Sequence, residues 1–76
     1  YKQERNEEAL AAFKSALAVN PNSAEAHYYL GEVYDRMNRD AESIAEYQKA
    51  VAINPRYEEA WFDLGVAYYN RERYDE

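Results

Sequence analysis

The sequence predicts an all-α protein built from a repeated pair of helices, and three observations carry this prediction. When the chain is aligned with itself at an offset of 34 residues, 14 of the 42 pairs are identical. A period of roughly 20 to 50 residues is typical of solenoid folds. The 76 residues include only two glycines and two prolines, which favours helix over sheet or disorder. Apolar residues also recur at i, i+3, i+4 and i+7, which marks one face of a helix.

The first predicted helix covers residues 4–18. Its apolar stripe consists of Ala9, Phe13, Ala16 and Leu17. The helix is expected to end near Asn20, because Pro21 follows and the residue before a proline avoids the α region.

The second predicted helix covers residues 24–37 and starts after Ser23, a good N-cap residue. Its stripe consists of His27, Leu30, Gly31 and Tyr34. A turn at residues 38–40 is expected to separate it from the third predicted helix, residues 41–53.

The third and fourth predicted helices repeat the first and second. The stripe of the third consists of Ser43, Tyr47, Ala50 and Val51, and its stop is Asn54-Pro55. The fourth, residues 58–71, has a stripe of Trp61, Leu64, Gly65 and Tyr68. Tyr57 stands where the earlier repeat has Ser23, so this helix starts without a favoured N-cap.

These residues resemble the tetratricopeptide repeat family, whose pattern is W-x2-L-G-x2-Y, then A-x3-F, then P. Residues 61–68, WFDLGVAY, match the first part fully, and residues 27–34, HYYLGEVY, match it except at His27. Residues 9–21 supply the remainder, and residues 43–55 supply it with Ser and Tyr in place of Ala and Phe. We interpret His27 as a packed substitute for the tryptophan of the pattern.

The resemblance covers the whole chain and implies a right-handed α-α superhelix of antiparallel helix pairs. It divides the single domain, residues 1–76, into a partial repeat at 1–23, a full repeat at 24–57 and a partial repeat at 58–76. The two glycines are expected at helix-to-helix contacts, where the absence of a side chain permits a close approach.

In this family the first helix of each repeat lines a concave groove that holds extended peptides. The resemblance therefore assigns to a peptide groove the residues Glu25, Tyr28, Tyr29, Glu32, Asp35, Arg36, Glu59, Phe62, Asp63, Val66, Tyr69 and Asn70. Five acids and one arginine predict a basic or aromatic peptide partner. Another interpretation is a solvated polar face with some exposed tyrosines. Binding is favoured because exposed Tyr28, Tyr29, Phe62 and Tyr69 would offer more apolar surface than solubility needs.

A groove that clamps C-terminal carboxylates, as in co-chaperones of this family, is not expected. The positions that would hold asparagine or basic side chains carry Tyr29, Glu32, Glu59 and Asp63. The formal net charge of −6 also opposes binding to nucleic acid or anionic lipid. Related families of helical repeats with 35 or 36 residues, one of which binds RNA, fit the 34-residue period less well.

A second function from a different class is self-assembly into a homo-oligomer. The first predicted helix lacks a partner before it, and the fourth lacks one after it, so their faces are expected to dock between chains. The residues of these two faces are Ala9, Phe13 and Ala16 on one, and Trp61, Leu64, Gly65 and Tyr68 on the other.

An enzyme is the least favoured class, and we expect no catalytic residue, cofactor or metal. His27 is the single histidine and cysteine is absent, so neither an activated nucleophile nor a Cys-ligated zinc site can be assembled. No apolar run reaches the roughly 18 residues of a membrane span, and residues 1–8 do not resemble a signal peptide. The lack of cysteine suits a reducing compartment, with the cytoplasm as the default.

Overall fold

The computed structural model describes the backbone of residues 2–75 and the side chains of residues 5–71. It contains four helices: α1 (Lys2–Val19), α2 (Ala24–Arg36), α3 (Asp40–Ile53) and α4 (Glu58–Asp75). No strand occurs in residues 2–75. The all-α fold is confirmed, and the four helices follow the predicted bounds closely, with α4 extending four residues beyond the predicted end.

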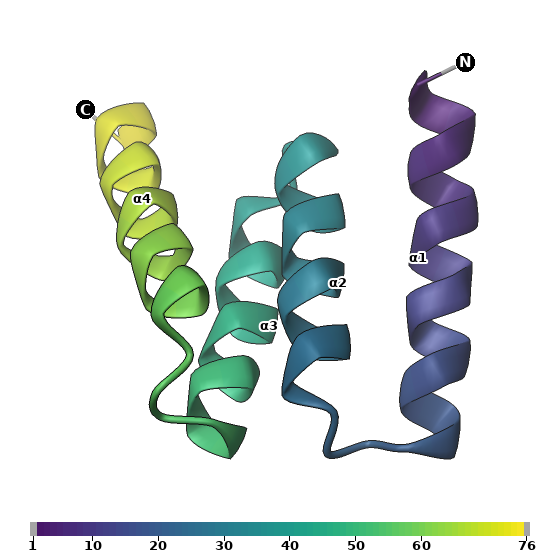
Figure 1. Cartoon of the computed structure of the whole chain (residues 1–76). Helices are drawn as coiled ribbons and strands as arrows, with labels where there is room; N and C mark the ends of the chain where they lie inside the picture. Colours follow the sequence, from purple (N-terminus) through teal and green to yellow (C-terminus); the bar gives the residue numbers. More distant parts are fainter. Residues whose placement is uncertain (1, 76) are drawn as a thin grey trace.

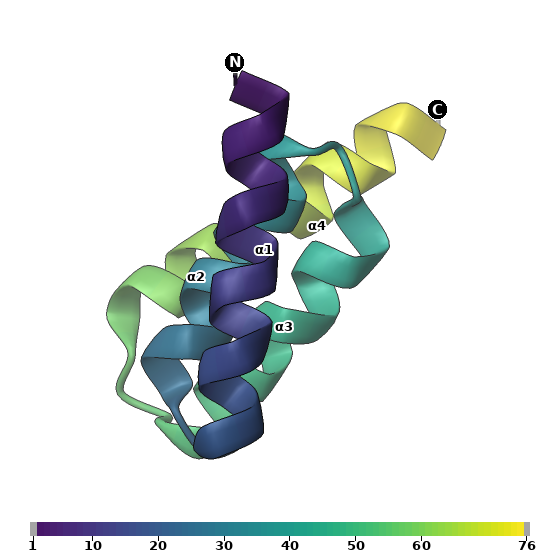
Figure 2. The same ribbon diagram turned by 90° about the vertical axis from the view of Figure 1, so that its right-hand side faces the viewer.

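Each helix packs against the next one along the chain: α1 on α2, α2 on α3, and α3 on α4. Figure 1 shows α1 and α4 at opposite ends of this row, with α2 and α3 between them. Figure 2 shows the same row from the side of α1. The principal extents are 39 × 34 × 15 Å, so the protein is a thin stack in which α1 and α4 each keep one outer face.

Local side-chain and backbone chemistry sets the helix ends. The Ser23 side chain accepts a hydrogen bond from the Ala26 N–H at 3.1 Å and caps α2 as expected. Asn38 has a φ of 61°, a left-handed conformation that asparagine tolerates better than most residues. This turn lets the Arg39 N–H bond the Tyr34 carbonyl at 2.9 Å, so that α2 stops and α3 can fold back against it.

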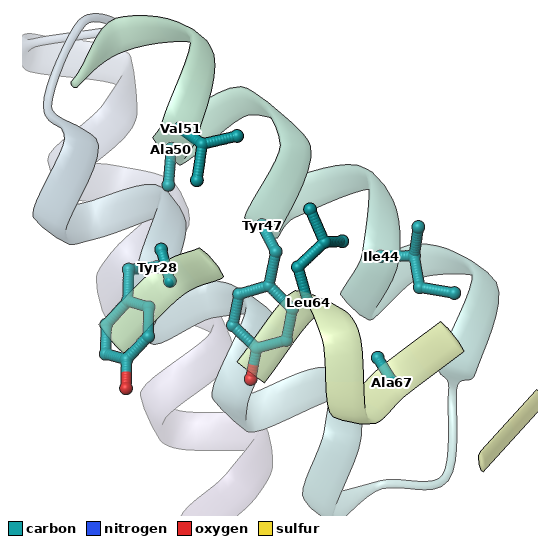
Figure 3. Packing of buried hydrophobic residues seen from close by; sticks show 8 residues of the cluster. Tyr28, Ile44, Tyr47, Ala50, Val51, Leu64 and Ala67 are labelled. Carbon is teal, nitrogen blue, oxygen red and sulfur yellow. The ribbon is translucent and has the colours of Figure 1, made fainter. Parts of the chain in front are cut away.

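The hydrophobic core lies where α2, α3 and α4 meet. Figure 3 shows Tyr28 of α2, Tyr47 of α3 and Leu64 of α4 in this cluster. Gly31 makes the close contact expected of it, because a Cβ built there would lie 2.7 Å from Tyr47 Cε1. Gly65 differs, since the same construction meets no heavy atom within 4 Å. Only one of the two glycines therefore occupies a helix contact within the chain.

His27 and Trp61 make equivalent hydrogen bonds in the two repeats. Trp61 Nε1 donates to the Pro55 carbonyl at 2.8 Å, and His27 Nε2 bonds the Pro21 carbonyl at 2.9 Å. The other ring nitrogen of His27 lies 2.7 Å from Glu46 Oε1 of α3. His27 is buried, and it substitutes for tryptophan as the sequence indicated.

Candidate functional site

The residues assigned to the peptide groove form one surface, called here the groove surface, which runs over α2 and α4. Tyr28 joins the two helices because its hydroxyl donates to Asp63 Oδ2 at 2.6 Å. The groove surface therefore lies across two neighbouring helices, although its two halves are 34 residues apart in the sequence. The structure brings together all twelve residues on these two helices, six on each.

Four apolar or aromatic side chains of the groove surface are exposed. Phe62 is 72% exposed, Tyr69 60%, Tyr29 45% and Val66 42%. Tyr28 corrects the sequence-based expectation, because it is only 8% exposed. It belongs to the core, where α4 covers it, and only its hydroxyl takes part in the polar network of the groove surface.

An aromatic cluster supports the α2 half of the groove surface. The Tyr28 ring lies 5.4 Å from that of Tyr29, 5.7 Å from that of Tyr47 and 5.0 Å from that of Tyr57. Phe13 of α1 stacks on Tyr29 at 5.6 Å. Aromatic pairs at such distances contribute beyond their buried area, so these rings hold Tyr29 in place.

Phe13 and Tyr57 were not assigned to the groove from the sequence. The sequence places Phe13 on the self-association face and identifies Tyr57 only as a poor N-cap. The signal for Tyr57 was its aromatic character at a position that normally carries a small capping residue. Burial and the neighbouring Tyr29 and Glu25 raise the pKa of Tyr57 to about 12, so its phenol stays neutral at physiological pH.

Three acids of the groove surface lie around a small cavity between α2 and α4. Glu32, Asp35 and Asp63 line this cavity, whose volume is about 140 Å³. The Tyr28 hydroxyl lies 3.2 Å from Glu32 Oε2 as well as 2.6 Å from Asp63 Oδ2. Burial and the negative charges of Asp40 and Asp63 raise the pKa of Asp35. Arg36 lines the same cavity, so the centre of the groove surface holds three acids and one arginine.

The remaining polar residues of the groove surface lie towards its two ends. Glu25 and Glu59 line a separate depression together with Tyr29 and Tyr57. Arg36 donates its Nε to Asn6 Oδ1 of α1 at 3.1 Å. Its guanidinium is thus held partly by α1, while Asn70 is half-buried on α4.

The residues assigned to self-association are only partly available. Trp61 is 50% and Tyr68 43% exposed, but Leu64 is 5% exposed. Leu64 corrects the expectation of an open face, because it packs inward against α3 as part of the core. On α1, Ala16 is exposed, whereas Ala9 and Phe13 are half-buried.

A comparison with protein-family models matches the chain to tetratricopeptide repeat models over residues 1–58 and 46–76. The chain belongs to the tetratricopeptide repeat family. The family and the helical-repeat fold support a general role as a protein-interaction scaffold, and both are typical of proteins without catalytic activity.

Among solved structures, this tetratricopeptide repeat chain is similar to the crystal structure of MamA, with a TM-score of 0.88 and 32% sequence identity. The alignment covers 93% of this chain and 42% of that chain, so the 76 residues span less than half of MamA. The comparison with curated proteins gave no significant match. Within the described residues, no helix has the length and apolar character needed to cross a bilayer.

Proposed function

We propose that the chain is a protein-interaction module that binds an extended peptide on the groove surface, without catalytic activity. The observation that carries this proposal is the exposure of Phe62 and Tyr69, 72% and 60%, beside three clustered acids on the same face. Large exposed aromatic rings rimmed by polar residues are typical of interaction sites.

The peptide that best fits this surface is basic or aromatic. Tyrosine and phenylalanine supply rigid contact area at low cost in conformational entropy. The acids steer cationic partners toward the groove and repel anionic ones. Arg36 is the one cation among the groove-surface residues, which include five acids, so its single positive charge leaves the negative potential largely uncompensated.

Two peptides of equal length, one rich in lysine and tyrosine and one rich in glutamate and tyrosine, test the proposal by titration against the 76-residue chain. We expect the lysine peptide to bind more tightly, with an affinity that falls as salt rises because exposed charges are screened. Phe62→Ala should weaken this binding. Val19→Ala is the matched control, because Val19 is 87% exposed and lies at the end of α1. Equal, salt-insensitive binding of the two peptides would refute the preference for a basic partner.

A second candidate, self-association, is supported by the difference between the two glycines. Tyr47 fills the space over Gly31, whereas the space over Gly65 is empty. Phe13 is the counterpart of Tyr47 one repeat earlier. We propose that Phe13 of a second copy occupies the space over Gly65, which would join copies head to tail.

Sedimentation over a range of concentrations tests this second candidate. The average mass of the unmodified chain should rise with concentration. Gly65→Leu should abolish the rise, because the new side chain fills the empty space without a clash inside the chain. Val19→Ala should leave it unchanged. A chain that stays monomeric at high concentration contradicts self-association and leaves the groove proposal untouched.

A further inference from the structure

Phe62 of α4 corresponds to Tyr28 of α2, because the two positions are one 34-residue repeat apart. Their surroundings differ, since Tyr28 is 8% and Phe62 72% exposed. Tyr28 belongs to the core cluster that α2, α3 and α4 form, and its ring lies 5.7 Å from that of Tyr47. α4 is the last described helix of the row (Figure 1), and no further described helix covers Phe62. The position that is buried in one repeat is therefore open in the next.

The contact between α2 and α4 around Tyr28 is polar. The Tyr28 hydroxyl donates to Asp63 Oδ2 at 2.6 Å and lies 3.2 Å from Glu32 Oε2. The residues one repeat away from Tyr28, Asp63 and Glu32 are Phe62, Tyr29 and Val66. These three side chains are 72%, 45% and 42% exposed, respectively. The counterparts of this polar contact are thus apolar or aromatic on both sides, and all of them are exposed in the free chain.

Phe13 of α1 and Tyr29 of α2 form a stacked pair, called here the aromatic pair, with ring centroids 5.6 Å apart and 18° between the ring planes. Phe13 is the counterpart of Tyr47, whose ring packs near that of Tyr28. Tyr29 is the counterpart of Asp63, which accepts the hydrogen bond from the Tyr28 hydroxyl. The aromatic pair therefore places on α1 and α2 the two side chains that would contact a ring in the position of Tyr28.

The rest of the core cluster also has apolar counterparts on α1 and α2. The counterparts of Ile44, Ala50 and Val51 on α3 are Leu10, Ala16 and Leu17 on α1. The counterparts of Ala60, Leu64 and Ala67 on α4 are Ala26, Leu30 and Val33 on α2. Ala50 is 0% exposed, whereas Ala16 is exposed. The surface that α3 and α4 present to Tyr28 is thus repeated on α1 and α2, and its α1 part is left uncovered.

We infer that Phe62 of one copy docks on the aromatic pair of a second copy, an inference that deepens the self-association candidate above and rests on it. α4 of the first copy would contact α1 and α2 of the second copy as α2 contacts α3 and α4 within the chain, which joins the copies head to tail. The occupant is a second copy because the internal interface has an apolar counterpart at every core position.

Aromatic side chains dominate the energetics of such interfaces, so Phe62 is the expected anchor of this one. A docked Phe62 ring is covered, as Tyr28 is, and a peptide that contacts Phe62 would compete with the second copy. The joint is apolar and each copy carries a formal net charge of −6. Screening of this repulsion should therefore strengthen association as salt rises, in contrast to the binding of the lysine peptide.

Sedimentation of the 76-residue chain and its variants measures the role of Phe62. Phe62→Ala should weaken association by about tenfold or more. Circular dichroism should show an unchanged fold, because the ring is 72% exposed in the free chain. Val19→Ala is the matched control: Val19 is 87% exposed, and its counterpart Ile53 lies outside the core cluster. The control should associate as the unmodified chain does.

Two blocked variants locate the joint. Phe62→Glu blocks the α4 side, and Ala16→Glu blocks the α1 side, because each would bury an unpaired carboxylate. Each variant alone should stay monomeric where the unmodified chain associates. An equal mixture retains one intact Phe62 and one intact α1–α2 surface, so it should form a dimer and nothing larger. Isotope-filtered NOE spectra of that dimer should connect Phe62 of the Ala16→Glu copy with Tyr29 of the Phe62→Glu copy.

The outcomes separate this inference from the proposals on which it rests. If Phe62→Glu associates as strongly as the unmodified chain while Gly65→Leu does not associate, the docking of Phe62 is overturned and self-association stands. A mixture that stays monomeric, or that grows beyond two chains, also overturns the docking, as does association that weakens when salt rises. If the unmodified chain stays monomeric at high concentration, this inference and self-association both fail, and the groove peptide is left as the partner of Phe62.

Discussion

Gly31→Ala and Gly65→Ala place the same change at the same position of two repeats, in two different surroundings. A Cβ at Gly31 would lie 2.7 Å from Tyr47 Cε1, 2.8 Å from Cδ1 and 3.2 Å from Cγ, whereas a Cβ at Gly65 meets nothing within 4 Å. The atoms that would clash include the inner part of the ring of a side chain that is 2% exposed. Tyr47 therefore cannot turn away without disturbing the core.

The magnitude follows from two opposing terms. Replacing glycine with alanine inside a helix stabilises it by about 1 kcal/mol. At Gly65 this term acts alone, so we expect the free energy of unfolding to rise by about 1 kcal/mol. At Gly31, overpacking costs about 1–3 kcal/mol, which offsets or exceeds the gain. Gly31→Leu adds more atoms to the same contact and should destabilise by more than about 2 kcal/mol.

Urea denaturation followed by circular dichroism measures the difference. We expect the two alanine variants to differ by about 1–3 kcal/mol. In a thermal melt, each kcal/mol corresponds to a shift of about 4–8 °C for a domain of this size. If the two variants change stability equally and in the same direction, then Tyr47 does not pack on Gly31 as described. If Gly65→Ala destabilises the chain, α4 is covered by something at that point.

Two further predictions concern polar groups in and near the core. Ser43→Ala should raise the free energy of unfolding by about 1 kcal/mol, because Ser43 Oγ is fully buried without a hydrogen-bond partner and burying such a group carries a desolvation penalty. Urea denaturation of the variant measures this change, and a loss of stability would contradict the prediction. Asp35→Asn should stabilise the chain at neutral pH and flatten its stability profile in acid. The pKa of Asp35 is raised by burial and by Asp40 and Asp63, so the folded state binds the proton more tightly than the unfolded state. Stability from this group is therefore lost as the pH rises from about 4, the ordinary aspartate value. Unfolding measured at several pH values should show that loss in the unmodified chain and not in the variant.

The helices and their order could be predicted from the sequence because their signals are local. Pro21 and Pro55 stop the helices that precede them, and Ser23 caps the next one through a bond to a residue three positions away. The close approach of a helix at Gly31 could also be predicted, although the sequence does not show that Tyr47 is the residue that makes it. Each of these features depends on spacing along the chain.

The burial of Tyr28 and Leu64 could not be predicted from the same spacing. Periodicity shows which residues share a face of one helix, but it does not show how far the neighbouring helix covers that face. The bond between Tyr28 and Asp63 spans 35 residues and depends on the angle at which α4 crosses α2. The cavity between α2 and α4 arises from the same crossing, so only the three-dimensional structure places Tyr47 of α3 beside acids from α2 and α4.

The bonds from His27 and Trp61 to the proline carbonyls bear on the mechanics of the stack. Each bond connects the first turn of a helix, α2 or α4, to the loop before it. It therefore stiffens the connection between successive repeats. The His27 ring makes a second hydrogen bond, to Glu46 on α3. Trp61 is half exposed, and its ring makes the one bond to the Pro55 carbonyl. We expect the connection at Trp61, between α3 and α4, to be more flexible than the connection at His27, between α1 and α2. Under a pull applied along the chain, the angle between α3 and α4 would then change before the angle between α1 and α2, and the curvature of the groove would change first at its α4 side.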